Sequence, residues 1–155
     1  MIMDNLISYA DAQLRVLKHL PNKGDLSLII LKGHLLIEEL LFALVSSAAK
    51  DPSAIKSGKL NYYQLASVAK ALFYEKHVGP VWDAIFELNA LRNTLVHNLE
   101  PQDLDKKLMK FGIVGYGREA SAANLVLSNP AGVMANNIET MCGVLTALIM
   151  MSQSK

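Results

Sequence analysis

The fold is decided by residues 25–49, DLSLIILKGHLLIEELLFALVSSAA. Apolar residues fall on nearly every side of the helix that this stretch would form, and a helix that is apolar all round is buried at the centre of a domain. Asp25 is a favourable residue to cap its start, and Lys50-Asp51-Pro52 ends it. We therefore expect residues 26–49 to form the central helix.

Helical periodicity continues on both sides of this stretch, whereas the alternation typical of strands is nearly absent. Apolar residues spaced by three and four, or capping residues, predict helices over 6–20, 61–73, 80–98 and from 130 into the polar tail, with a short polar helix over 103–110. Residues 112–129 are the least periodic region and are expected to be partly loop. The pattern predicts an all-α fold, an up-and-down bundle of four long helices plus one or two short helices, as a single domain over 1–155.

Composition limits the classes of protein to which the chain can belong. It has 155 residues, of which 52% are hydrophobic and 19% charged, so it is not a disordered chain. The formal net charge of +1 excludes a whole-molecule field that would hold RNA or DNA, so any nucleic-acid contact must come from a local patch. The single cysteine, Cys142, excludes an intramolecular disulfide and a cysteine-based zinc site, and we expect it to be buried. One reduced cysteine, no signal peptide and no membrane span predict a cytoplasmic protein.

Three common enzyme motifs are missing from the sequence. There is no glycine-rich phosphate loop, no Gly-x-Ser-x-Gly elbow and no His-Glu-x-x-His. The four histidines, His19, His34, His77 and His97, are scattered, with no ligand pair at helical spacing. We expect neither a metal nor a cofactor.

The end of the helix predicted over 80–98 carries the most informative residues, Arg92, Asn93 and His97. Histidine transfers protons near neutral pH, and arginine binds phosphate and stabilises the charge of a phosphoryl-transfer transition state. The Asn93 amide could orient either group, and it shares a helix face with His97, four residues on. Arg92 lies five residues before His97, about 140° around a helix. A site that uses both side chains is therefore expected to need a cleft shared with a second protomer.

Residues 89–98, NALRNTLVHN, resemble the signature of the HEPN superfamily, the higher eukaryotes and prokaryotes nucleotide-binding domains. In that signature an arginine is followed by a polar residue, often asparagine, and a histidine comes four to six residues after the arginine. The resemblance implies a bundle of four or five helices and catalysis by Arg92, Asn93 and His97. It also implies a metal-independent ribonuclease that works as a homodimer, in many members as a toxin or defence effector controlled by an antitoxin.

Other polar residues are candidates for a supporting role. His34 and Glu38 interrupt the central helix on one face, and Arg92 is the expected partner of the Glu38 carboxylate. Lys106, Lys107 and Lys110 follow the motif and are weaker candidates for contacts with an RNA backbone. Each also has a structural interpretation. Arg92 would pair with Glu38 or Glu87, His97 would cap its helix, His34 and Glu38 would be a buried pair, and the lysines would form a solvated face.

Three functions follow from these observations. The first is an endoribonuclease that cleaves RNA through attack of the 2′-hydroxyl, as a homodimer under the control of an antitoxin or other regulatory protein. The second is a non-catalytic HEPN-like binding or regulatory module. The third is a helical adaptor that acts through protein–protein contacts. The motif favours the first function, and the near-neutral charge favours the other two.

Overall fold

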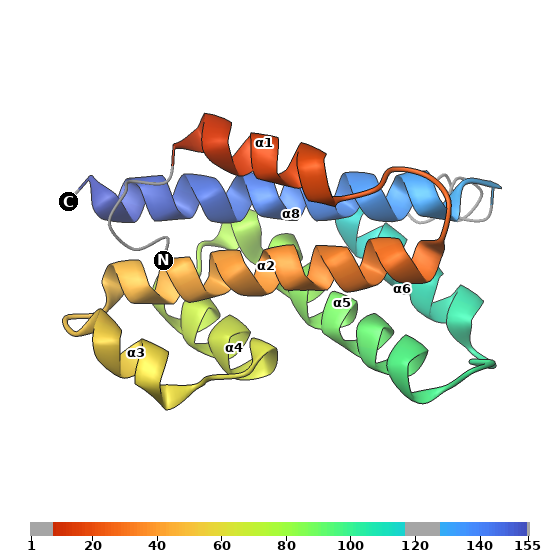
Figure 1. Cartoon of the computed structure of the whole chain (residues 1–155), viewed down its shortest axis with the longest axis horizontal. Coiled ribbons are helices and arrows are strands. Elements are labelled where there is room, and N and C mark those ends of the chain that lie inside the picture. Colours follow the sequence, from red (N-terminus) through yellow and green to blue (C-terminus); the bar gives the residue numbers. More distant parts are fainter. Residues whose placement is uncertain (1–7, 117–127, 155) are drawn as a thin grey trace.

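The computed structural model describes residues 8–116 and 128–154, and their regular structure is entirely helical (Figure 1). The elements are α1 (Tyr9–His19), α2 (Leu26–Ala48), α3 (Pro52–Gly58), α4 (Tyr62–Phe73), the 3-10 helix η1 (Lys76–Val78), α5 (Gly79–His97), α6 (Leu104–Tyr116) and α8 (Pro130–Gln153). The predicted all-helical bundle is confirmed. Within the described residues the bundle holds more helices than the predicted four long and one or two short ones.

Capping side chains set the starts of several helices, including α2, α4 and α8. The Asp25 carboxylate accepts hydrogen bonds from the backbone N–H groups of Ser27 and Leu28 at the start of α2. Asn61 and Gln64 form a capping box on α4, in which each side chain accepts from the other residue's backbone N–H. Asn129 accepts from the backbone N–H of Gly132 at the start of α8. These bonds satisfy donors that have no partner within the helix itself.

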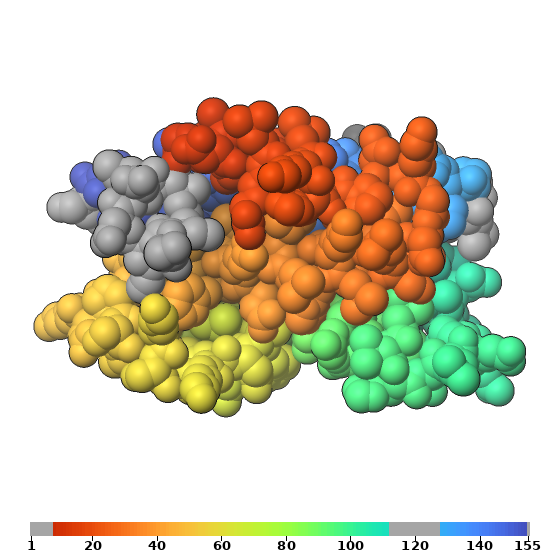
Figure 2. Space-filling model, in the orientation of Figure 1, coloured from red at the N-terminus to blue at the C-terminus, as the bar shows by residue number. Residues whose placement is uncertain are grey.

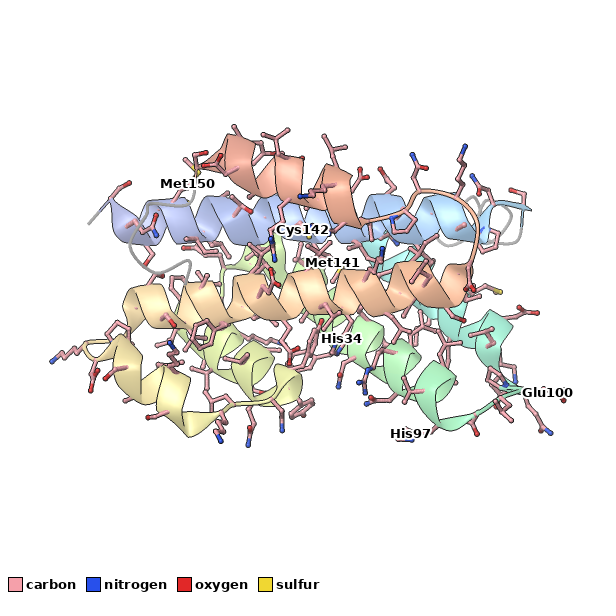
Figure 3. All side chains as sticks on the ribbon, viewed as in Figure 1. His34, His97, Glu100, Met141, Cys142 and Met150 are labelled. Atoms are coloured by element: carbon pink, nitrogen blue, oxygen red, sulfur yellow. The ribbon has the colours of Figure 1, made fainter. Side chains whose placement is uncertain are left out.

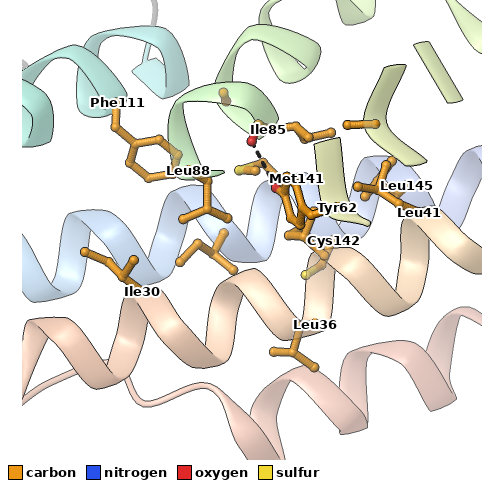
Figure 4. Packing of buried hydrophobic residues seen from close by; sticks show 14 of the residues in the cluster. Ile30, Leu36, Leu41, Tyr62, Ile85, Leu88, Phe111, Met141, Cys142 and Leu145 are labelled. Atoms are coloured by element: carbon orange, nitrogen blue, oxygen red, sulfur yellow. Dashed lines mark hydrogen bonds between the residues drawn. The ribbon is translucent and has the colours of Figure 1, made fainter. Parts of the chain in front are cut away.

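The two longest helices, α2 and α8, run alongside each other through the bundle (Figure 1). Helix α1 covers α8, whereas α4 and α5 pack against α2 on another side, and α6 packs on α5 and α8. The shared core contains large side chains from five of these helices, including Ile37, Leu65, Ile85, Phe111 and Leu145, all nearly inaccessible to solvent. Figure 4 shows Ile85, Phe111 and Leu145 in this core. Cys142 is buried among them, as predicted.

The helix predicted over 6–20 is present, but part of its apolar spacing faces solvent. Leu14 and Leu17 contribute to that spacing and are 64% and 70% exposed, whereas Leu20 at its end is buried. The buried residues of α1 are Ala12 and Val16, which also stand four apart. Because these side chains are smaller, they allow α1 to lie closely on α8. Leu6, at the start of the predicted range, lies outside the described residues.

Two other helices differ from their prediction. Helix α3 was not predicted, although Asp51 caps it and Pro52 stands in its first turn, an arrangement typical of a helix start. Helix α6 begins where expected but continues to Tyr116, into the region expected to be partly loop. Its buried residues Leu108 and Phe111 pack in the core, and this tertiary contact stabilises a helix that sequence periodicity alone indicated only as far as Lys110.

Helix α8 is long and apolar enough to cross a membrane by length and composition alone. More than half of its most apolar stretch is buried inside the bundle. A core helix of this kind meets the same criteria as a membrane span. The buried part of α8 packs against α1, α2 and α6.

Candidate functional site

The central polar residue of the bundle is His34, which lies where α2, α4 and α5 meet (Figure 3). Its side chain is buried, and its ring stacks on that of Tyr62 with centroids 4.0 Å apart and planes 17° apart. Its Nε2 lies 3.1 Å from Oδ1 of Asn89 on α5. Since an amide oxygen only accepts hydrogen bonds, Nε2 carries the proton in this bond. His34 therefore connects three helices through one imidazole.

Burial lowers the pKa of His34 below its ordinary value because the protonated ring is poorly solvated. The hydrogen bond to Asn89 and the Glu38 carboxylate act in the opposite direction, and the Arg92 guanidinium adds to the lowering. His34 is therefore neutral at neutral pH. The same interactions show that the charges of Glu38 and Arg92 both lie within electrostatic range of this imidazole.

Arg92 is half-buried on α5, where its Nη1 donates a hydrogen bond to Oδ1 of Asn93 at 3.0 Å. The expected ion pair between Arg92 and Glu38 is wrong, because no nitrogen of the guanidinium lies within 4.0 Å of that carboxylate. Glu87, the other expected partner, pairs instead with Lys110. The guanidinium is held by the neighbouring amide, which leaves its Nε and Nη2 groups without a protein partner among the described residues.

His97 is the last residue of α5 and is exposed, two turns beyond Asn89, the residue of α5 that bonds to His34 (Figure 3). No hydrogen bond or ion pair joins it to Arg92, in agreement with the difference of about 140° around the helix. Asn98 follows as the cap residue and donates from Nδ2 to the carbonyl oxygen of Thr94. The structure therefore brings Arg92 and Asn93 together and leaves His97 apart within one chain.

Each of the three candidate lysines has a partner within the protein. Lys106 and Asp103 form an exposed ion pair of 3.6 Å, and Lys110 pairs with the half-buried Glu87 at 2.5 Å. Lys107 is half-buried and donates to Oγ1 of Thr94 in the last turns of α5. Lys106 and Lys110 remain exposed and lie on the helix that follows the motif, whereas Lys107 fastens α6 to α5.

Two residues of this region were missed by sequence reasoning. Asn89 stands three residues before Arg92, so helical spacing could have placed it on the same face. Tyr62, on α4, donates its hydroxyl proton to the carbonyl oxygen of Ile85 at 2.9 Å (Figure 4). Burial raises the pKa of the Tyr62 hydroxyl well above its ordinary value.

The predicted pairing of His34 with Glu38 is replaced by the bond from His34 to Asn89.

Glu38 lies one turn after His34 on the same face of α2 and is half-buried. It forms no hydrogen bond or ion pair with any residue in the described ranges 8–116 and 128–154, although its charge acts on both His34 and Tyr62. Over the same ranges, no three histidine, cysteine, aspartate or glutamate side chains gather as a metal site would require.

Comparison with protein-family models, curated proteins and solved structures finds no significant match to this chain.

Proposed function

We propose that this protein is a metal-independent endoribonuclease of the HEPN type that acts on RNA as a toxin or defence effector. The observation that carries the proposal is the pair formed by Arg92 and Asn93 on α5, the helix that ends in exposed His97. Two guanidinium nitrogens of Arg92 have no protein partner among the described residues. These groups supply a phosphate-binding cation, an orienting amide and a proton-transfer group.

In the proposed reaction His97 takes the proton of a ribose 2′-hydroxyl as the oxygen attacks the adjacent phosphorus. A bond forms between the 2′-oxygen and phosphorus, and the bond from phosphorus to the 5′-oxygen breaks. The departing oxygen takes a proton from water, and His97 returns its proton to the resulting hydroxide. The products are a 2′,3′-cyclic phosphate and a 5′-hydroxyl. Arg92 stabilises the charge that grows on the phosphoryl oxygens.

The separation of Arg92 and His97 within one chain favours a site shared by two copies. If Arg92 from one copy and His97 from the other meet at the same phosphate, each chain alone is incomplete. Mixing a copy with Arg92→Ala and a copy with His97→Ala should then restore activity that neither variant has alone. Light scattering on the same samples gives the oligomeric state.

The activity is tested by incubating the purified full chain with single-stranded RNA in excess chelator and analysing the product ends. We expect cyclic phosphate ends, no cleavage of the matching DNA, and loss of cleavage with His97→Ala or Arg92→Ala. The matched controls are His77→Ala and Arg15→Ala, which alter exposed side chains on η1 and α1. Undiminished cleavage by His97→Ala would contradict the proposal.

A second candidate is a non-catalytic HEPN-like module, or a helical adaptor, that acts through protein contacts. The observation that favours it is the exposure of large apolar side chains such as Leu14, Leu17 and Leu35 on α1 and α2. This candidate predicts that replacing these leucines by serine abolishes association in light scattering. It also predicts that no RNA is cut and that Arg92→Ala alters stability alone.

A further inference from the structure

Two opposite charges lie near His34. Glu38 stands one turn after His34 on α2 and is half-buried. Arg92 belongs to α5, one turn beyond Asn89, which bonds to the same imidazole. The surface is indented where α4 gives way to α5 (Figure 2).

Both charged groups retain binding capacity. Within the described part of the chain Glu38 has no hydrogen-bond or ion-pair partner, and Arg92 uses one guanidinium nitrogen on Asn93. A half-buried charge such as Glu38, which has no protein partner in the described residues, loses hydration without gaining a bond, which is unfavourable in the free protein. A ligand with an anionic group and a pair of N–H donors would satisfy both residues.

We propose that Glu38 and Arg92 together recognise a guanine nucleotide in single-stranded RNA, with the carboxylate accepting from the guanine base and the guanidinium binding its phosphate. This inference rests on the proposed function and names the base that the site selects. Unpaired bases in RNA are read in this way, through their Watson–Crick edges. Glu38 is then the residue that determines specificity.

The chemistry of the four bases leads to guanine. A carboxylate accepts two parallel hydrogen bonds, and guanine presents two neighbouring donors, N1–H and the N2 amino group. In adenine and cytosine the amino group stands beside a ring nitrogen whose lone pair repels a carboxylate. In uracil the single N3–H lies between two carbonyl oxygens, which repel it as well. Guanine is therefore the base with which both carboxylate oxygens form bonds.

His34 supports this role for Glu38 by remaining neutral. A protonated imidazole one turn away would pair with the carboxylate and compete with the base. Burial and the nearby Arg92 charge both disfavour that protonation. The stacking on Tyr62 and the bond to Asn89 fix the ring in place, so Glu38 stays available as an acceptor.

The test uses the full chain with His97→Ala, which the proposed mechanism makes able to bind RNA without cutting it. Fluorescence anisotropy measures binding of a short oligouridine that carries one central guanosine, and of the same oligonucleotide with inosine or adenosine at that position. Inosine keeps N1–H but lacks the amino group. We expect guanosine to bind about five- to a hundred-fold more tightly than adenosine, with inosine in between.

The matching protein variant is Glu38→Gln, with Glu39→Gln as its control because Glu39 is exposed and paired with Arg15. Glu38→Gln should remove the preference for guanosine, and Glu39→Gln should keep it. Equal binding of the guanosine, inosine and adenosine oligonucleotides would overturn the inference even if Glu38→Gln fails to fold. If RNA is bound and cut without preference for guanine, the specificity is wrong and the ribonuclease stands. If no RNA is bound, both proposals fail.

Discussion

His34 on α2 and Asn89 on α5 are joined by a hydrogen bond of 3.1 Å across 55 residues of sequence. Tyr62 stacks on the same imidazole and bonds to the backbone of α5 four residues before Asn89. The three side chains fix the turn of α5 that precedes Arg92. The position of the candidate phosphate-binding residue thus depends on polar contacts in the interior of the bundle.

The stability of the protein should fall in mild acid because of His34. Burial lowers the folded-state pKa of this histidine below its ordinary value of 6.5. As the pH falls below the ordinary histidine pKa, the unfolded chain binds a proton that the folded chain still resists. The free energy of unfolding therefore decreases. Glu38, Arg92 and Tyr62 are the ionisable groups that share its surroundings.

The measurement is urea denaturation at pH ~7 and pH ~5 for the wild type and for His34→Gln. The variant should be less stable at neutral pH and should lose less stability on acidification, because it has no imidazole to protonate. His77→Gln, which changes an exposed histidine, should behave as the wild type does. The same acid loss in His34→Gln as in the wild type would show that other groups are responsible.

Local signals were the most predictable features of the fold. Asp25 and Asn61 were expected to begin helices, and both caps are present because a cap involves only residues within the next turn. The bond between His34 and Asn89 could not be predicted, since it depends on how distant helices pack. For the same reason the expected pairing of Arg92 with Glu38 was wrong. Arg92 and Asn93 were expected to act together from their adjacency, and they do contact each other.

Cys142 should be unreactive in the folded protein. Its side chain is buried, and burial, together with the nearby Glu139 carboxylate, raises the pKa of the thiol to about 12. The thiolate is the nucleophile in alkylation, so the folded chain offers neither access nor the reactive form at pH ~8. Mass spectrometry after iodoacetamide treatment should show labelling only when denaturant is present. Rapid labelling of the native protein would mean that α8 separates from the core readily.

Lys107 should contribute more to stability than its neighbour Lys106. The Lys107 ammonium is half-buried and donates to Oγ1 of Thr94, near the C-terminal end of α5 where positive charge is favourable. Lys107→Met should lower the free energy of unfolding by about 0.5–1.5 kcal/mol. Lys106→Met breaks only the exposed pair with Asp103 and should have a smaller effect. Urea denaturation of the two variants makes the comparison, and equal effects would rule out a special role for the bond to Thr94.

Gly33 should be required for the close approach of α2 to α8. A Cβ atom added at Gly33 would overlap Cδ1 of Ile138 and lie 3.1 Å from its Cγ1 and Cγ2 atoms. Ile138 is fully buried and has little room to move. Overpacking of this kind costs about 1–3 kcal/mol, which opposes the gain of about 1 kcal/mol that alanine brings as a helix former. We expect Gly33→Ala to lower the free energy of unfolding.

A double-mutant cycle identifies the cause. Ile138→Val removes the Cδ1 atom, so Gly33→Ala should be tolerated better in the Ile138→Val background than in the wild type. Gly58→Ala is the matched control, because an added Cβ there meets no atom closer than Cδ2 of Leu60 at 4.0 Å. That variant should be as stable as the wild type or more stable, as the helix preference of alanine dictates. Additive effects of Gly33→Ala and Ile138→Val would show that the two residues do not meet. His34 follows Gly33 directly, so a shift of α2 would also disturb the hydrogen bond from His34 to Asn89. The loss of unfolding free energy on acidification should then differ between the Gly33→Ala variant and the wild type.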